Sequence, residues 1–145
     1  MKGTEVADAL EEQFKELVSD VEFPRENVVR VSLSRESILP FCKFLRDELH
    51  CEHLSLVSAV DWLENYECVY HIVSYLEEYV VELHVKIPKD DPKVHSLSEV
   101  WRGADYPERE AYDMMGITFE EHPDHRRILL PEDFKFYPLR KDFKG

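Results

Sequence analysis

Residues 66–76, YECVYHIVSYL, and residues 79–87, YVVELHVKI, decide the fold of this chain. In both runs apolar side chains recur at every second position, which is the period of a strand with one buried face. Only two glutamates separate the runs, and so short a connection favours a hairpin. The runs therefore predict the centre of an antiparallel sheet. We expect one face of the second strand to be wet or to hold a partner, because it carries Glu82, His84 and Lys86.

The preceding residues add two strands and two helices to this centre. Residues 53–62 form another strand-like run, joined to the hairpin by Glu64-Asn65, and residues 27–32 alternate as a half-buried strand. Apolar residues at helical spacing predict amphipathic helices over 6–18 and from Ser34 to about His50. Pro40 should bend the first turns of the second helix or shift its start. The predicted class is α+β, a two-layer domain with helices on a mostly antiparallel sheet, followed by an extended C-terminal segment.

The chain divides into three parts, residues 1–95, 96–116 and 117–145. In the middle part, Ser96 to Glu99 matches a capping box and predicts a short helix through Trp101. Pro107 suits the first turn of another helix, over Glu108–Met114, which should end near Gly116.

Residues 117–145 contain three prolines and show no strand or helix period, yet they are rich in apolar and basic side chains. Such a segment either wraps the chain's own sheet or lies on another protein. We predict an extended tail that another polypeptide completes, since arginine is over-used at protein interfaces. A chain that ends at Gly116 should then stay folded and fail to assemble.

The composition excludes several functional classes. The chain has 145 residues and a formal net charge of −13, which argues against a general affinity for nucleic acid or anionic lipid. No apolar run approaches the roughly 20 residues that span a bilayer, and the first residues lack a signal core, so we expect a cytoplasmic protein without direct membrane insertion. Three cysteines and four glycines provide neither a four-cysteine cluster nor a glycine-rich phosphate loop.

Three stretches resemble the C subunit of the respiratory complex I family of NADH:quinone oxidoreductases. They are ADYPEREAYDMMGI at 104–117, FEEHPDHRRILLPED at 119–133 and PLRKDF at 138–143. Related subunits belong to deazaflavin-linked dehydrogenases and membrane-bound nickel–iron hydrogenases. The sequence departs from the family pattern at Glu121, at His125 and over residues 134–137, which leaves open which of these complexes it serves.

The resemblance implies a non-catalytic structural or assembly subunit. Such a subunit lies on the hydrophilic arm of a membrane-bound oxidoreductase that passes electrons from NADH or a related donor to quinone or a related acceptor. The implied partners are the large hydrophilic subunit that forms the quinone site and the iron–sulfur subunits. The implied cofactors are iron–sulfur clusters in those partners, with none in this chain, and the implied location is the cytoplasmic face of the cell membrane.

The candidate partner-binding residues lie on the 108–114 helix and in the tail. They are Glu108, Arg109, Glu110, Asp113, His122, Arg126, Arg127, Arg140, Lys141 and Asp142. On a helix, Arg109 and Asp113 would pair with each other, which would leave Glu110 for a partner. For the helix charges an internal charge network is the alternative.

Two further alternatives concern metal and thiol chemistry. His122 and His125, with Asp124, could bind a metal, and a small metal-dependent enzyme or a soluble adaptor remains the rival function. Cys51, between His50 and His53, would need a lowered pKa to act as a nucleophile, and the nearby glutamates oppose this.

Overall fold

The computed structural model describes residues 3–14, 18–122, 137–138 and 140. These residues form three α-helices, seven strands and two 3₁₀ turns. In chain order they are α1 (Gly3–Gln13), β1 (Val18–Arg25), β2 (Val28–Ser34), η1 (Arg35–Ser37), α2 (Ile38–Glu48), β3 (His53–Asp61), β4 (Asn65–Ser74), β5 (Tyr79–Pro88), β6 (Lys93–His95), η2 (Arg102–Ala104), α3 (Asp105–Met115) and β7 (Thr118–Glu120).

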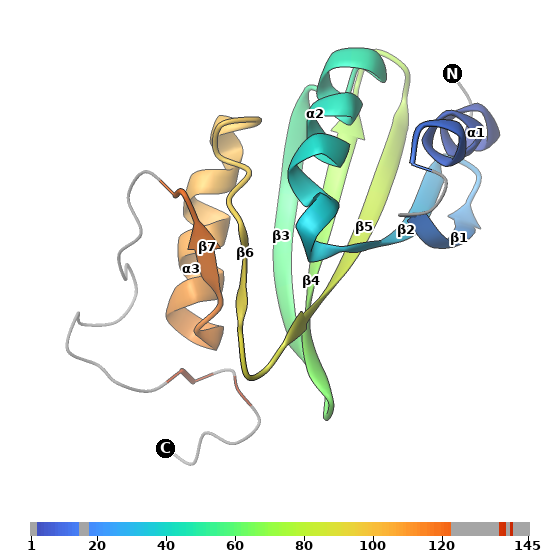
Figure 1. Cartoon of the computed structure of the whole chain (residues 1–145). Coiled ribbons are helices and arrows are strands. Elements are labelled where there is room, and N and C mark those ends of the chain that lie inside the picture. Colours follow the sequence, from blue (N-terminus) through green and yellow to red (C-terminus); the bar gives the residue numbers. More distant parts are fainter. Residues whose placement is uncertain (1–2, 15–17, 123–136, 139, 141–145) are drawn as a thin grey trace.

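The main layer is a five-stranded sheet with the order β1-β2-β5-β4-β3 (Figure 1). β3, β4 and β5 form the predicted antiparallel meander, with Cys68 opposite Val85 and Tyr70 opposite Leu83. β2 joins β5 in parallel, and the other three pairings are antiparallel. The α+β class and the mostly antiparallel sheet are therefore confirmed.

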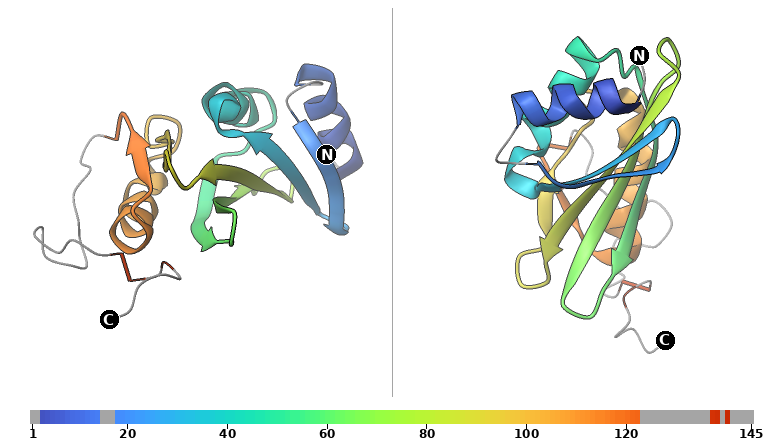
Figure 2. Two further views of the ribbon diagram at one scale, coloured as in Figure 1. Left: turned by 60° about the horizontal axis from the view of Figure 1, so that its bottom comes forward. Right: turned by 90° about the vertical axis from the view of Figure 1, so that its right-hand side faces the viewer.

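Helices α1 and α2 cover one face of this sheet (Figure 2). The alternate side chains of β4 and β5 that face them are buried, and they form the core with the apolar face of α2. The predicted core residues of α2 are all buried: Ile38, Phe41, Cys42, Leu45 and Leu49.

A second unit stands beside the sheet edge formed by β3. It consists of α3 and the two-stranded parallel sheet β6-β7, and α3 packs against β3 (Figure 1). None of the helices in the described ranges combines the length and apolarity needed to cross a bilayer.

The structure corrects the expected N-terminal elements. The first helix ends at Gln13, well before Val18, and Val18–Arg25 forms an edge strand despite Pro24. A proline is tolerated on an edge strand because its missing N–H need not face a neighbour. The second α-helix starts at Ile38, which leaves Pro40 in the first turn, where helical N–H groups lack intrahelical acceptors anyway.

Two predictions beyond residue 95 are also wrong. No helix follows Ser96, because residues 98–100 form a turn. The stretch after Gly116 is not uniformly irregular, since β7 pairs with β6 and buries Phe119. The predicted α3 is confirmed, and it ends at Gly116 in the left-handed conformation, with φ 74°.

Candidate interaction site

Helix α3 carries four of the predicted partner-binding residues, and three of them point inward. Glu108 and Asp113 are 0% exposed and Arg109 is 8% exposed. The guanidinium of Arg109 lies 5.3 Å from the centre of the Tyr106 ring. Charged side chains are rarely buried unless they are paired, so these residues serve the packing of α3 itself. The proposed pairing of Arg109 with Asp113 stays a prediction.

Glu108 ties α3 to the connection that follows β6. Its Oε1 accepts a hydrogen bond from Ser96 Oγ at 2.6 Å, and its Oε2 accepts one from the Leu97 N–H at 2.8 Å. Burial raises the pKa of the Glu108 carboxyl to about 7, against the lowering effect of these two bonds, and the charge of Asp105 adds to the rise. The Ser96 hydroxyl therefore binds Glu108 and caps no helix.

His122 lies against the first turn of α3. It follows β7 directly, and its side chain is 0% exposed. Its Nε2 lies 3.1 Å from Asp105 Oδ1, 3.2 Å from the Asp105 carbonyl oxygen and 3.8 Å from Glu108 Oε1. We define these side chains as the α3 cluster, namely Ser96, Asp105, Glu108 and His122.

Metal binding and a cysteine nucleophile gain no support here. Within the described residues, no three or more His, Cys, Asp or Glu side chains are arranged to hold a metal ion, and His125 and Asp124 lie outside these residues. Burial raises the pKa of the Cys51 thiol to about 11, with a contribution from Glu52, although the Tyr79 hydroxyl opposes the rise. A thiol in that environment is a poor nucleophile at neutral pH.

Arg140 closes the opposite end of α3. Its Nε donates to the carbonyl oxygen of Met115 at 2.6 Å, and its guanidinium lies 4.4 Å from the Tyr137 ring centre and 5.2 Å from that of Tyr66. A cation suits this place, because the carbonyl groups at a helix C-terminus carry partial negative charge. The sequence predicts that Arg140 anchors on a neighbouring protein, whereas in this structure its guanidinium contacts the chain itself.

Gly116 makes this contact possible. A Cβ at this position would meet Arg140 Nη2, and it would lie 2.8 Å from the Tyr137 ring. With its positive φ, the position is restricted to glycine on two independent grounds.

Glu110 is the exception on α3. It is exposed, and it forms no hydrogen bond or ion pair with any described residue. That Glu110 contacts a partner stays a prediction. The other predicted residues, Arg126, Arg127, Lys141 and Asp142, lie outside the described residues.

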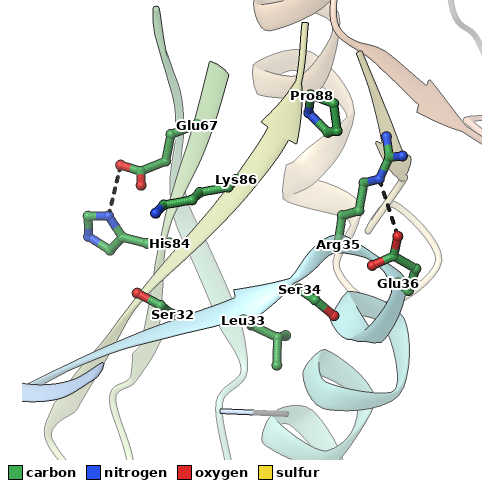
Figure 3. A pocket seen from close by; sticks show the side chains of 9 residues that line it. All are labelled: Ser32, Leu33, Ser34, Arg35, Glu36, Glu67, His84, Lys86 and Pro88. Atoms are coloured by element: carbon green, nitrogen blue, oxygen red, sulfur yellow. Dashed lines mark hydrogen bonds and ion pairs between the residues drawn. The ribbon is translucent and has the colours of Figure 1, made fainter. Parts of the chain in front are cut away.

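The face of the main sheet opposite α1 and α2 holds a second polar site (Figure 3). A pocket of about 370 Å³ opens there, between η1 and the strands β2, β4 and β5. His84 connects two carboxylates, with Nδ1 3.1 Å from Glu67 Oε1 and Nε2 2.7 Å from Glu82 Oε1. Arg30 Nε also donates to Glu82 Oε1, at 2.9 Å. These groups satisfy one another across neighbouring strands, as cross-strand charge pairs do.

Three residues of the α3 region escape sequence reasoning, each for a different reason. Asp105 lies in a recognisable stretch, but its approach to His122 depends on β7, which has no detectable period. The sequence identifies Tyr66 only as a strand residue, and nothing in its neighbourhood indicates a stacked arginine 74 positions away. The sequence identifies Gly116 as a helix end, but it does not show that the side chain of Arg140 packs against this glycine.

Comparison with known proteins agrees with this architecture. Residues 31–145 match the family described as respiratory-chain NADH dehydrogenase, 30 Kd subunit. The chain is 32% identical to the C subunit of the F(420)H(2) dehydrogenase of Methanosarcina mazei, over 100% of this chain and 94% of that protein. It is 38% identical to the C subunit of the NADH-quinone oxidoreductase of Geobacter sulfurreducens, over 92% of this chain and 85% of that protein.

Two solved structures resemble the fold. A chain of the membrane-bound sulfane sulfur reductase, an archaeal respiratory membrane complex, matches with a TM-score of 0.86 over 98% of this chain and 85% of its own length, at 22% identity. A trypsin-resistant fragment of Nqo5 matches with a TM-score of 0.70 over 82% of this chain and 98% of its own length, at 26% identity. The family match covers well over half of the chain and the two curated relatives exceed 30% identity, so the resemblance seen in the sequence is confirmed: the chain belongs to the family of the 30 Kd subunit of respiratory-chain NADH dehydrogenase.

Proposed function

We propose that this chain is a non-catalytic structural and assembly subunit of the hydrophilic arm of a complex-I-like, membrane-bound oxidoreductase. The complex would carry electrons from NADH or a related donor to quinone or a related acceptor. The chain would lie at the cytoplasmic face of the membrane, held there by its partners. Iron–sulfur clusters would belong to those partners, and this chain would hold no cofactor.

The observation that carries this proposal is that charged residues of α3 are buried inside the chain, where a substrate would not reach them. An enzyme needs its titratable groups to reach a substrate. Here the Glu108 carboxylate is fully buried and bonded to Ser96 and Leu97, so it holds two segments of the chain together. The arrangement favours a scaffold whose recognisable residues maintain a shape.

The relatives support the kind of assembly. Those named above are subunits of an F(420)H(2) dehydrogenase and of an NADH-quinone oxidoreductase. We infer by similarity that the partners of this chain are the large quinone-site subunit and the iron–sulfur subunits of one such complex. Glu110 and the basic residues of the C-terminal segment, Arg126, Arg127 and Lys141, are the proposed contacts with these partners, together with Asp142.

Affinity purification from native membranes tests the assignment. An N-terminal tag on the full chain, expressed at native abundance, should recover the large hydrophilic subunit and the iron–sulfur subunits after gentle solubilisation. Recovery of the chain alone would contradict the proposal.

A truncated variant is the matched control for the role of the C-terminal segment. The cut belongs after His122, because a cut after Gly116 would also remove β7 and the buried Ile117 and Phe119. We expect the 1–122 chain to fold and to recover none of the partners. Normal assembly of that variant would refute the role of the segment.

A further inference from the structure

We propose that the groove between α3 and the edge strand β3 receives an apolar side chain of a partner subunit, and that Glu110 on its rim pairs with an arginine or lysine beside that side chain. This inference rests on the proposed function, because it needs a partner subunit to supply the segment. It goes beyond that function by naming the surface and the chemistry of the segment.

Small side chains and methionines line the groove. Ser58 and Ala59 of β3 belong to the lining, together with Ala111, Met114 and Met115 of α3. No described residue fills this space, whose volume is about 180 Å³. Methionine side chains adapt readily to different apolar partners, so the lining is suited to an inserted side chain.

The size of the groove favours a protein side chain over a small molecule. Pockets that hold drug-sized ligands or cofactors usually measure roughly 300–1,000 Å³. A volume of about 180 Å³ is too small for such a ligand, and it can accept one side chain of leucine or methionine size. Binding energy at protein interfaces is concentrated where single side chains fill such desolvated pockets.

The negative charge on the rim of the groove indicates which residue accompanies the inserted apolar side chain in the partner segment. Glu110 is the exposed carboxylate of α3, since Glu108 and Asp113 are buried and Asp105 lies beside His122. The guanidinium of Arg109 lies over the Tyr106 ring, and Glu110, also within the described part of the chain, forms no ion pair with it. With a net charge of −13, the chain as a whole also favours a basic surface. A basic side chain next to an apolar one is therefore the complement of this site.

Cysteine labelling in the assembled complex tests the groove directly. The native Cys42, Cys51 and Cys68 are all buried, so a Glu110→Cys variant offers a single accessible thiol. Glu12→Cys is the matched control, because Glu12 is an exposed carboxylate on α1, another helix of 11 residues. The labelling rate with a negatively charged maleimide is measured for both variants, in the isolated full chain and in the complex purified from membranes.

We expect the rate for Glu110→Cys to fall at least about tenfold on assembly, because the partner segment would cover this position. We also expect Glu110→Lys to lower the yield of complex more than Glu110→Gln does, with little effect of Glu12→Lys. Mutating the matching partner residue from arginine or lysine to glutamate should restore the yield of the Glu110→Lys variant.

Two results would overturn the inference while leaving the proposed function intact. One is a Glu110→Cys labelling rate that is the same in the co-purified complex as in the isolated chain. The other is full protection already in the isolated chain, which would mean that the chain's own C-terminal segment fills the groove. Failure of the wild-type chain to co-purify with any partner would instead refute the proposed function, and the inference with it.

Discussion

At the scale of single residues, Glu108 shows how a buried carboxylate can serve a fold. Its two oxygens accept hydrogen bonds from Ser96 and Leu97, and yet burial raises its pKa to about 7. The unfolded chain releases this proton near pH 4.5, so the folded state retains it over a wider pH range. Stability from this group is complete below about pH 4.5 and declines as the pH rises toward 7.

Glu108→Gln should remove this pH dependence while keeping a side chain of the same shape. We expect the free energy of unfolding of the wild type, relative to the variant, to fall by about 3 kcal/mol between pH 4.5 and 8, at about 1.4 kcal/mol for each unit of pKa. Urea denaturation of both proteins at several pH values measures the difference. A constant difference across this range would show that Glu108 titrates normally.

Gly116→Ala should destabilise the chain because the position tolerates no Cβ. The positive φ costs about 1 kcal/mol in a non-glycine residue, and the clash with Tyr137 and Arg140 adds to it. Gly103→Ala is the control, since a Cβ there would meet only the Leu54 carbonyl oxygen at 3.4 Å. Thermal unfolding of the two variants should show a clear loss for Gly116→Ala and a small change for Gly103→Ala. Equal losses would contradict this account.

At the scale of elements, α3 is held at both ends by residues that follow it. His122 lies against its first turn, and Arg140 donates a hydrogen bond to the carbonyl oxygen of Met115, its last residue. A short helix gains little stability from its own hydrogen bonds, so tertiary contacts of this kind decide whether it forms. The segment after α3 contributes as well, because Ile117 and, within β7, Phe119 are both buried.

Two truncations separate these contributions. We expect the chain ending at His122 to unfold cooperatively with a loss of about 1.5–3 kcal/mol, because it keeps His122 and β7 but lacks the hydrogen bond from Arg140 to Met115. The chain ending at Gly116 should lose about 4 kcal/mol or more, because burial of a large apolar side chain contributes roughly 1.5–3 kcal/mol and two are removed. Circular dichroism during urea denaturation compares them. A stable 1–116 chain would mean that β7 is dispensable.

The elements differ in how far the sequence can predict them. Four elements are predictable, namely the strands β3, β4 and β5 and the helix α2. Their apolar residues repeat over ten or so positions, and short turns join the strands. The edge strand β1 escapes prediction because Pro24 and the charged residues around it hide the period. β7 spans three residues, too few for any period, and its pairing with β6 depends on contacts distant in the chain.

The candidate site shows the same limit. A helical pattern predicts that charged residues face solvent. It also predicts that Glu110 and Arg109, as neighbours on a helix, point in different directions. It cannot predict that Glu108 and Asp113 are buried. For Glu108 the burial depends on contacts with the segments around residues 96 and 122. Motif spacing therefore located α3, while the environment of each charge required the tertiary structure.

At the scale of the whole molecule, two carboxylates in different layers respond to pH in opposite directions. Glu82 lies on the sheet face opposite α1 and α2; burial would raise its pKa, but hydrogen bonds from His84 and Arg30 outweigh this effect and lower it. A lowered pKa provides stability at neutral pH that is lost as the pH falls below the ordinary glutamate range. The contribution of Glu108 to stability is instead lost as the pH rises from about 4.5 to 7.

The chain should therefore be most stable in mildly acidic solution. Above pH 7 the Glu108 contribution is lost and the net charge of −13 adds self-repulsion, whereas in strong acid the Glu82 contribution disappears. We expect a maximum of the free energy of unfolding at about pH 4.5 to 5, where the Glu82 contribution is present and the Glu108 contribution has only begun to fall. Urea denaturation from pH 3 to 9 measures the profile.

Three comparisons test which groups cause the loss of stability on the acid side (the acid limb) and on the alkaline side (the alkaline limb) of this profile. Glu82→Gln should flatten the acid limb and leave the alkaline limb unchanged, and Glu12→Gln, at an exposed position on α1, should change neither limb. Added salt at pH 8 should raise stability, because at about 0.1 M the screening length is only about 10 Å and repulsion between distant carboxylates weakens. A maximum at or above pH 8, or a loss of stability with salt at that pH, would show that buried Glu108 and the excess of acidic groups do not control the alkaline limb.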